Sequence, residues 1–86
     1  MELYYHRRFR KQFQKLDSKL QKRCTKALEQ LKNDHHNPHL RNHPLHGDMS
    51  GRRSISVGGD LRIIFRETNN YQYVTLLDVG THNQVY

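Results

Sequence analysis

The sequence predicts an α+β domain of order β-α-α-β-β-β, in which a helical hairpin packs on one face of a small, antiparallel-rich sheet. Two observations predict the strands: residues 52–66 alternate between apolar and polar side chains, and residues 71–79 form a mostly apolar run. A third predicts the helices, because residues 6–32 space their apolar side chains three and four positions apart. The 86 residues suffice for one such domain, which we place over residues 1–86.

The first strand and the first helix follow from short local patterns. Residues 2–5 alternate between Leu3 and Tyr5, which predicts a strand. Residues 6–16 predict an amphipathic helix, with basic side chains opposite an apolar stripe made of Phe9, Phe13 and Leu16.

The second helix is predicted to begin at Asp17 or Ser18 and to end near residue 32. Both residues are good N-caps, and Gln21 completes a capping-box pattern with Ser18. The very short link between the two helices predicts that they run antiparallel. Residues 33–50 are rich in asparagine, histidine, proline and glycine, so we expect loops and turns there.

Residues 52–66 predict a hairpin whose register is set by its side chains. A loop of three residues, Gly58-Gly59-Asp60, places Leu61 opposite Val57, Arg62 opposite Ser56 and Ile63 opposite Ile55. We expect a bulged loop in which Asp60 takes the left-handed conformation. One face of the hairpin is then apolar, and the other carries Arg52, Ser54, Ser56, Arg62 and Arg66.

The last strand is predicted over residues 71–79, after a polar turn at residues 67–70. It is apolar on both faces near Val74–Leu77, which predicts a central position in the sheet. Gly80 is expected to break the strand, and residues 81–86 to form a tail. The sheet face opposite the helices is therefore predicted to be free for binding.

The net charge of +7 predicts an acidic partner, either a nucleic acid or an acidic protein segment. A membrane surface fits less well, because no segment places bulky apolar residues beside the basic ones. The single cysteine, Cys24, allows no internal disulfide, which is typical of a reducing cytosol. No apolar run is long enough to cross a bilayer, and the first residues do not resemble a signal peptide, so we predict a cytoplasmic protein.

Five histidines lie close together in the sequence: His35, His36, His39, His43 and His46. Imidazole suits zinc, copper and nickel, but the segment has no cysteine and no repeated ligand spacing. A solvated polar loop explains His35, His36 and His39 better, so we expect no metal site and no cofactor.

Two of these histidines flank the start of the hairpin, where they join other titratable groups. His43 and His46 are predicted to share one face with Asp60, His82 and Tyr86. Acid–base groups beside arginines suit cleavage of an RNA phosphodiester by its own 2′-hydroxyl, without a metal. No P-loop, nucleophile elbow or pair of carboxylates indicates another chemistry.

Two longer motifs resemble a known family of proteins. The segment G-R-R-x-x-x-V-G-x-x-L-R-I-I-F-R and the ending V-T-L-L-D-V-G-T-H-x-x-V-Y resemble the RelE/ParE superfamily of toxin–antitoxin toxins. His43-Pro44-Leu45-x-Gly47 together with Gly80-Thr81-His82-x-x-Val85-Tyr86 is most similar to the YafQ branch.

The resemblance implies a ribosome-dependent endonuclease that cuts mRNA in the A site, leaves a 2′,3′-cyclic phosphate and is neutralised by a cognate antitoxin. The implied partners are the antitoxin, the ribosome with its rRNA, and mRNA. The implied catalytic residues are His43, Asp60, Arg62, His82 and Tyr86. The residues that we expect to contact RNA are His46, Arg52, Arg53, Ser56 and Arg66.

The chain departs from the YafQ pattern at two positions and leaves two other functions open. The family has a histidine where this chain has Ser56, and an aromatic residue where it has Leu61, so His82 and His43, with His46 as a substitute, are expected to carry more of the catalysis. The alternatives are a non-enzymatic DNA gyrase inhibitor of the ParE type, against which His82 and Tyr86 argue, and a decayed toxin that only binds.

Overall fold

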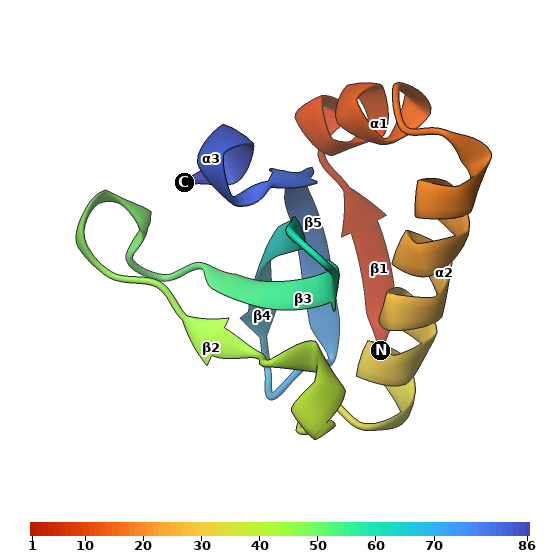
Figure 1. Cartoon of the computed structure of the whole chain (residues 1–86). Helices are drawn as coiled ribbons and strands as arrows, with labels where there is room; N and C mark the ends of the chain where they lie inside the picture. The colour runs from red at the N-terminus through yellow and green to blue at the C-terminus, as the bar shows by residue number, and fades with distance from the viewer.

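The computed structural model describes residues 1–86 and has a five-stranded sheet with helices on both faces (Figure 1). The strand order is β1-β5-β4-β3-β2, with β1 and β5 parallel and the other pairs antiparallel. The strands are β1 (Glu2–Tyr5), β2 (His43–Pro44), β3 (Arg53–Gly58), β4 (Leu61–Thr68) and β5 (Tyr73–Thr81). The helices are α1 (Arg7–Gln14), α2 (Ser18–Asn33) and α3 (His82–Val85), with 3-10 turns η1 (Pro38–Leu40) and η2 (Gly47–Met49). The predicted α+β class is confirmed, with β2 and α3 added to the predicted order.

The hairpin of β3 and β4 has the predicted register in its middle and a different loop. Ile55 pairs with Ile63, and Ser56 with Arg62, as the alternation of side chains predicts. Leu61 pairs with Gly58 instead of Val57, however, because a bulge follows Ser56. Gly58 and Gly59 adopt positive φ values of 120° and 55°, whereas Asp60 does not, so the prediction for Asp60 is wrong. A glycine reaches these values more easily because it has no Cβ.

Both long helices begin at a side-chain cap, and they differ in detail from the predictions. The N-cap of α2 is Asp17, whose side chain accepts a hydrogen bond from the Leu20 N–H (2.9 Å). Because Ser18 is already inside the helix, the predicted capping box does not form, and the Gln21 amide donates instead to the Phe13 carbonyl (3.0 Å). The two helices do not lie antiparallel along their length: α1 crosses the end of β1 and β5, and α2 runs down beside the sheet (Figure 1).

The main core lies between the sheet and these two helices. Phe65 and Leu31 are fully buried in it, and Phe9 is only 2% exposed. Phe13 is half-buried at its edge and stacks on Phe9 with a ring-centroid distance of 6.0 Å. The central position predicted for the last strand is confirmed, since β5 lies between β1 and β4. It continues through Gly80 to Thr81, so the predicted break at Gly80 is wrong.

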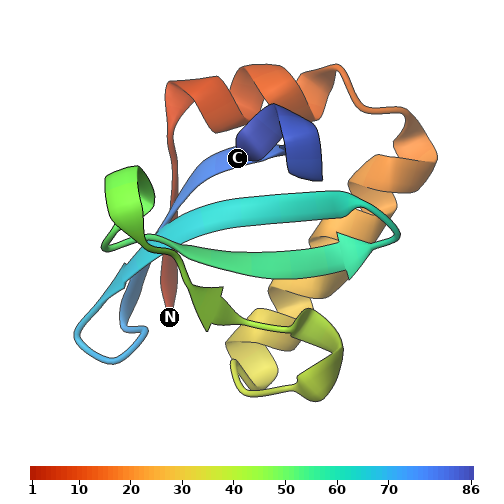
Figure 2. The ribbon, with the colours of Figure 1, turned by 60° about the vertical axis from the view of Figure 1, so that its left-hand side comes forward.

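The opposite sheet face is partly covered, and the prediction of a free face is therefore wrong in part. The buried residues Ile64, Leu77 and Val85 form a second apolar cluster there, and Leu45 and Met49 pack against it. Val85 belongs to α3, which folds back over the ends of β4 and β5 (Figure 2). This small cluster fixes the C-terminal tail on the sheet and places its polar side chains beside those of β3 and β4.

Candidate active site

Arg62 lies in β4, between Ser56 of β3 and Gly80 of β5 in the cross-strand register. Its Nη1 atom donates to the Ser56 hydroxyl (3.3 Å) and to the backbone carbonyls of Gly59 (2.9 Å) and Leu61 (3.0 Å). The Nε and Nη2 atoms make no hydrogen bond within the protein. One edge of the guanidinium is thus held by the hairpin, and the other is available to an anion such as a phosphate.

The tail brings His82 and Tyr86 to the turn that contains Asp60. The backbone N–H of His82 donates to the Asp60 carbonyl (3.1 Å), which ties the start of α3 to the β3–β4 turn. The rings of His82 and Tyr86 are one helical turn apart and pack edge to face, with centroids 4.5 Å apart. Both side chains are exposed, as is Asp60, so all three are accessible to a bound molecule.

Tyr86 is also anchored to the middle of the sheet, through a residue that we did not predict as functional. Its hydroxyl donates to the hydroxyl of Ser54, which is fully buried. His43 is the cross-strand partner of Ser54 in β2, so His43 projects from the same face as Tyr86. The alternation of polar residues in β3 had already placed Ser54 on this face, and its link to Tyr86 depends on how the tail folds.

The hydrogen bond of His43 determines which of its ring nitrogens carries a proton. Nδ1 lies 2.7 Å from the carbonyl oxygen of Arg41, and a carbonyl can only accept a hydrogen bond. Nδ1 must therefore carry the hydrogen, which leaves the lone pair of the neutral ring on Nε2. The Nε2 atom of the exposed His43 ring therefore has a free lone pair that can accept a hydrogen bond or a proton.

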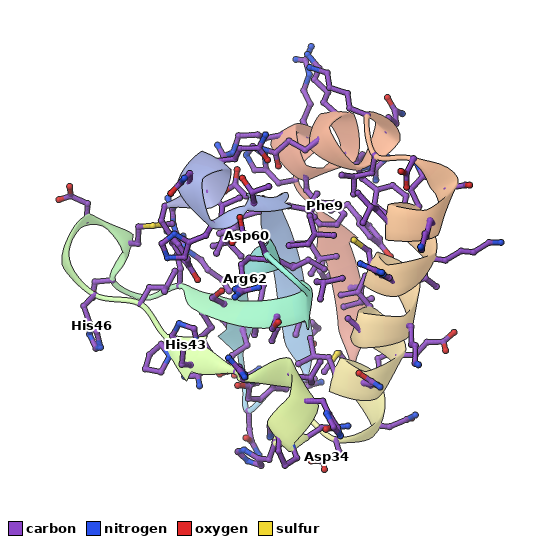
Figure 3. The ribbon with its side chains drawn as sticks, viewed as in Figure 1. Phe9, Asp34, His43, His46, Asp60 and Arg62 are labelled. Carbon is purple, nitrogen blue, oxygen red and sulfur yellow. The ribbon has the colours of Figure 1, made fainter.

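Three of the residues predicted to bind RNA lie apart from this group. His46 stands at the outer loop before η2 and points away from Arg62 (Figure 3). Arg53 faces the helix side, where its Nε donates to the Asn42 side chain (2.8 Å). Arg66 follows Arg62 by four positions in β4, which corresponds to about 13 Å along a strand.

The two departures from the family pattern have structural consequences. Leu61 is buried in the main core, so its side chain is unavailable to stack on a base. Ser56 is half-buried and accepts the hydrogen bond from Arg62. Its hydroxyl therefore helps to hold the arginine in place.

An ion pair between the half-exposed Arg8 and the buried Asp78 fixes the end of β5 that leads into α3. Asp78 accepts hydrogen bonds from Arg8 Nε and Nη2, the latter at 2.9 Å, and from the Gln12 amide at 3.2 Å. Gln12 also accepts from the backbone N–H of Val79 (2.9 Å), next to the bulge that shifts the register of β4 and β5. Burial raises the pKa of Asp78, but the hydrogen bonds from Arg8 and Gln12, with the nearby charge of Arg52, hold it below its ordinary value.

Replacing Arg8 by alanine is expected to lower the free energy of unfolding by about 1–2 kcal/mol at pH 7, a modest value because Arg8 is half exposed. The depressed pKa of folded Asp78 stabilises the native state above the unfolded pKa, and this contribution is lost as pH falls through the folded value. The difference in the free energy of unfolding between wild type and Arg8→Ala should therefore become smaller below about pH 4. Urea unfolding of both proteins at pH 7 and pH 3 measures this difference. An equal difference at the two pH values would contradict a stabilising role for the Arg8–Asp78 pair.

The lack of a side chain at Gly80 allows α3 to pack on the sheet. A Cβ at this position would lie 2.8 Å from Gln84 Oε1 and 3.2 Å from Val85 Cγ1. Gln84 Oε1 also accepts the hydrogen bond from the Thr81 N–H that begins the helix (2.8 Å). The Gly in the Gly-Thr-His motif therefore has a steric role.

We expect Gly80→Val to displace α3 and to reduce any activity of the site by about 100-fold, the typical effect of misplacing a reacting group by roughly 1 Å. Valine is well suited to a strand, so the sheet should persist. Activity and the circular dichroism spectrum should be measured together. A fully active Gly80→Val protein would show that the position of α3 is unimportant.

No three His, Cys, Asp or Glu side chains are grouped so that they could hold a metal ion. His35 stacks on Tyr71, with ring centroids 3.9 Å apart. Burial raises the pKa of Cys24 to about 11, so its thiol is a poor nucleophile near neutral pH. None of the helices combines the length and the apolar composition that crossing a bilayer requires.

Comparison with known proteins assigns the chain to a family. Residues 1–86 match the family described as "Bacterial toxin of type II toxin-antitoxin system, YafQ". No curated protein sequence matches the chain.

Among solved structures, YafQ from E. coli strain BL21(DE3) is 18% identical, with a TM-score of 0.83 over 99% of this chain and 97% of that chain. The YoeB/ParE toxin from Agrobacterium tumefaciens is 19% identical, with a TM-score of 0.80 over 95% of this chain and 99% of that chain. A chain of the E. coli DinJ–YafQ toxin–antitoxin complex is 19% identical, with a TM-score of 0.80 over 99% of this chain and 96% of that chain. The fold is thus that of RelE- and YafQ-like toxins, and by its family match the chain belongs to the YafQ toxins of bacterial type II toxin–antitoxin systems.

Proposed function

We propose that this toxin is a ribosome-dependent endonuclease that cuts mRNA in the A site. The observation that carries the proposal is the free edge of the Arg62 guanidinium, which lies on the same part of the sheet as Asp60, His82 and Tyr86. An arginine with two nitrogens, Nε and Nη2, whose N–H donors are unused suits the charge that develops on a phosphodiester during cleavage, since exposed acid–base side chains lie on the same part of the sheet.

The proposed reaction needs only groups of the protein and of the RNA. A base removes the proton of the 2′-hydroxyl, and the 2′-oxygen attacks the adjacent phosphorus. The bond from phosphorus to the 5′-oxygen breaks, and an acid protonates the leaving oxygen. The products are a 2′,3′-cyclic phosphate and a 5′-hydroxyl, while Arg62 stabilises the extra negative charge on the phosphoryl oxygens.

The geometry favours His43 as the base and His82 as the acid. The Nε2 lone pair of His43 is available because Nδ1 donates to a carbonyl. His82 starts a helix that is tied to the Asp60 turn, and its exposed imidazole can give a proton to the leaving oxygen. Tyr86 is the exposed aromatic ring of this site and is suited to stack on a base, a role that the buried Leu61 cannot take.

The same proposal specifies the partners. Ribosomal RNA and mRNA are polyanions, and the net charge of +7 attracts them. The solved DinJ–YafQ complex contains an antitoxin, and we propose a cognate antitoxin with acidic segments for this toxin as well. The place of action is the cytoplasm, where ribosomes and mRNA meet.

A single 2′-deoxy substitution in the mRNA tests the proposed chemistry. If the 2′-oxygen is the nucleophile, a deoxynucleotide on the 5′ side of the cleaved bond should abolish cutting there. The same substitution one codon upstream should have no effect and serves as the control. Continued cutting at the deoxy position, mapped by primer extension on programmed ribosomes, would rule out this mechanism.

A further inference from the structure

A groove of about 480 Å³ lies between α2 and the outer edge of β3, beside the candidate active site. Its cationic and titratable side chains are Arg23 and Lys26 of α2 and His39 of η1. The remaining lining is small or uncharged and consists of Ala27, Gln30, Ser56, Val57 and Gly58. No carboxylate lines it, so the groove has a net positive charge.

The positive charge of this groove is not neutralised within the protein. Arg8 and Asp78 form the one ion pair of the structure, so neither Arg23 nor Lys26 has a carboxylate partner. Both side chains are exposed, as is that of His39. Unpaired cations along a concave surface concentrate the field and attract anions more strongly than the same charges on a convex helix surface.

The groove follows the outer edge of β3, where η1 packs nearby but no strand pairs beyond Ser54. β2 pairs only with Arg53 and Ser54, so the outer side of β3 from Ile55 to Gly58 has no neighbouring strand. Ser56 lies on this edge, and its hydroxyl accepts the hydrogen bond from Arg62. The groove therefore begins at the residue that supports the proposed phosphate-binding arginine, and it leads away from it toward α2.

We propose that this groove is a second RNA subsite, which binds backbone phosphates of nucleotides next to the cleaved bond. The inference rests on the proposed function for the identity of the anion as RNA. The bound strand would then pass from the His82 and Tyr86 side, over Arg62, to Arg23 and Lys26. The contacts are to phosphates, so the groove adds affinity and fixes the direction of the strand without reading its sequence.

The test compares two double variants that remove the same charge. Arg23→Gln/Lys26→Gln alters the groove, and Lys11→Gln/Lys15→Gln alters exposed positions of α1 and its C-cap; each lowers the net charge from +7 to +5. The probe is a fluorescent RNA oligonucleotide that carries a 2′-deoxy group at the cleaved position. Anisotropy is measured over a series of KCl concentrations, and circular dichroism checks the fold of both variants.

The groove variant should bind this RNA roughly tenfold more weakly than the control variant. The slope of log K against log salt should also become shallower by about 1.4, because the variant loses two phosphate contacts and each single-strand contact contributes about 0.7. On programmed ribosomes it should raise KM and leave kcat unchanged. Equal affinities and slopes for the two variants would overturn the proposal, as would a groove variant that lost antitoxin binding but kept its RNA affinity. If wild type failed to cut mRNA, the proposed function would fail, while the anisotropy comparison would still decide whether the groove binds RNA.

Discussion

Replacing His82 by alanine is expected to lower the rate of mRNA cleavage by about 10²- to 10⁴-fold, the usual contribution of a general acid or base. The fold should persist, because the His82 side chain is exposed and its ring packs edge to face on Tyr86, which is also exposed. The hydrogen bond to the Asp60 carbonyl uses the backbone N–H of residue 82 and remains possible with alanine. The single-turnover rate on programmed ribosomes measures the effect directly.

His46→Ala is the matched control, since His46 is also an exposed histidine but points away from the site (Figure 3). It should cleave at nearly the wild-type rate. The two variants therefore separate a catalytic imidazole from one that adds only surface charge. Loss of activity in His46→Ala together with full activity in His82→Ala would reverse the assignment of the acid–base group.

Arg62→Ala should reduce cleavage by about 10²- to 10³-fold, as the loss of one preorganised donor to a developing anion does in other enzymes. Arg62→Lys should recover only part of the rate, because an ammonium keeps the charge but lacks the planar fork that spans the hairpin carbonyls and the phosphate. The measured quantity is kcat, since the arginine is expected to act mainly in the transition state.

Arg66→Ala provides the comparison for this arginine. Arg66 is exposed on the same strand, four residues away, and its removal changes the net charge by the same amount. We expect a small increase in KM and little change in kcat. If Arg62→Ala lost no more activity than Arg66→Ala, the role of Arg62 at the phosphate would be refuted.

The parts of the fold that depend on neighbouring residues could be predicted from the sequence. The register of Ile55 with Ile63 and of Ser56 with Arg62 follows from the period of two in strands, because a slip by one residue would expose the core face. The same alternation placed Arg62 on the face where the tail ends. The prediction was wrong for the loop between β3 and β4. A bulge follows Ser56, and the residues with positive φ are Gly58 and Gly59 instead of Asp60.

Contacts between distant parts of the chain could not be predicted in this way. The pair of Arg8 and Asp78 joins residues 70 positions apart, and the bond of Tyr86 to Ser54 spans 32 positions. The last six residues are too few for a helical period to show, so α3 and the cluster around Val85 were not anticipated. These long-range contacts hold α3, with His82 and Tyr86, on the sheet face that carries Arg62, and they explain why a face predicted to be free is partly covered.

The most direct test of the central proposal uses ribosomes programmed with a defined mRNA and an empty A site. Purified protein is added, mRNA 5′ ends are mapped by primer extension, and the same mRNA without ribosomes is treated in parallel. The account predicts a cut within the A-site codon that requires the ribosome and disappears with His82→Ala. The absence of any cut by a protein whose circular dichroism shows it folded would contradict the endonuclease, leaving a toxin that acts by binding, as a gyrase inhibitor does.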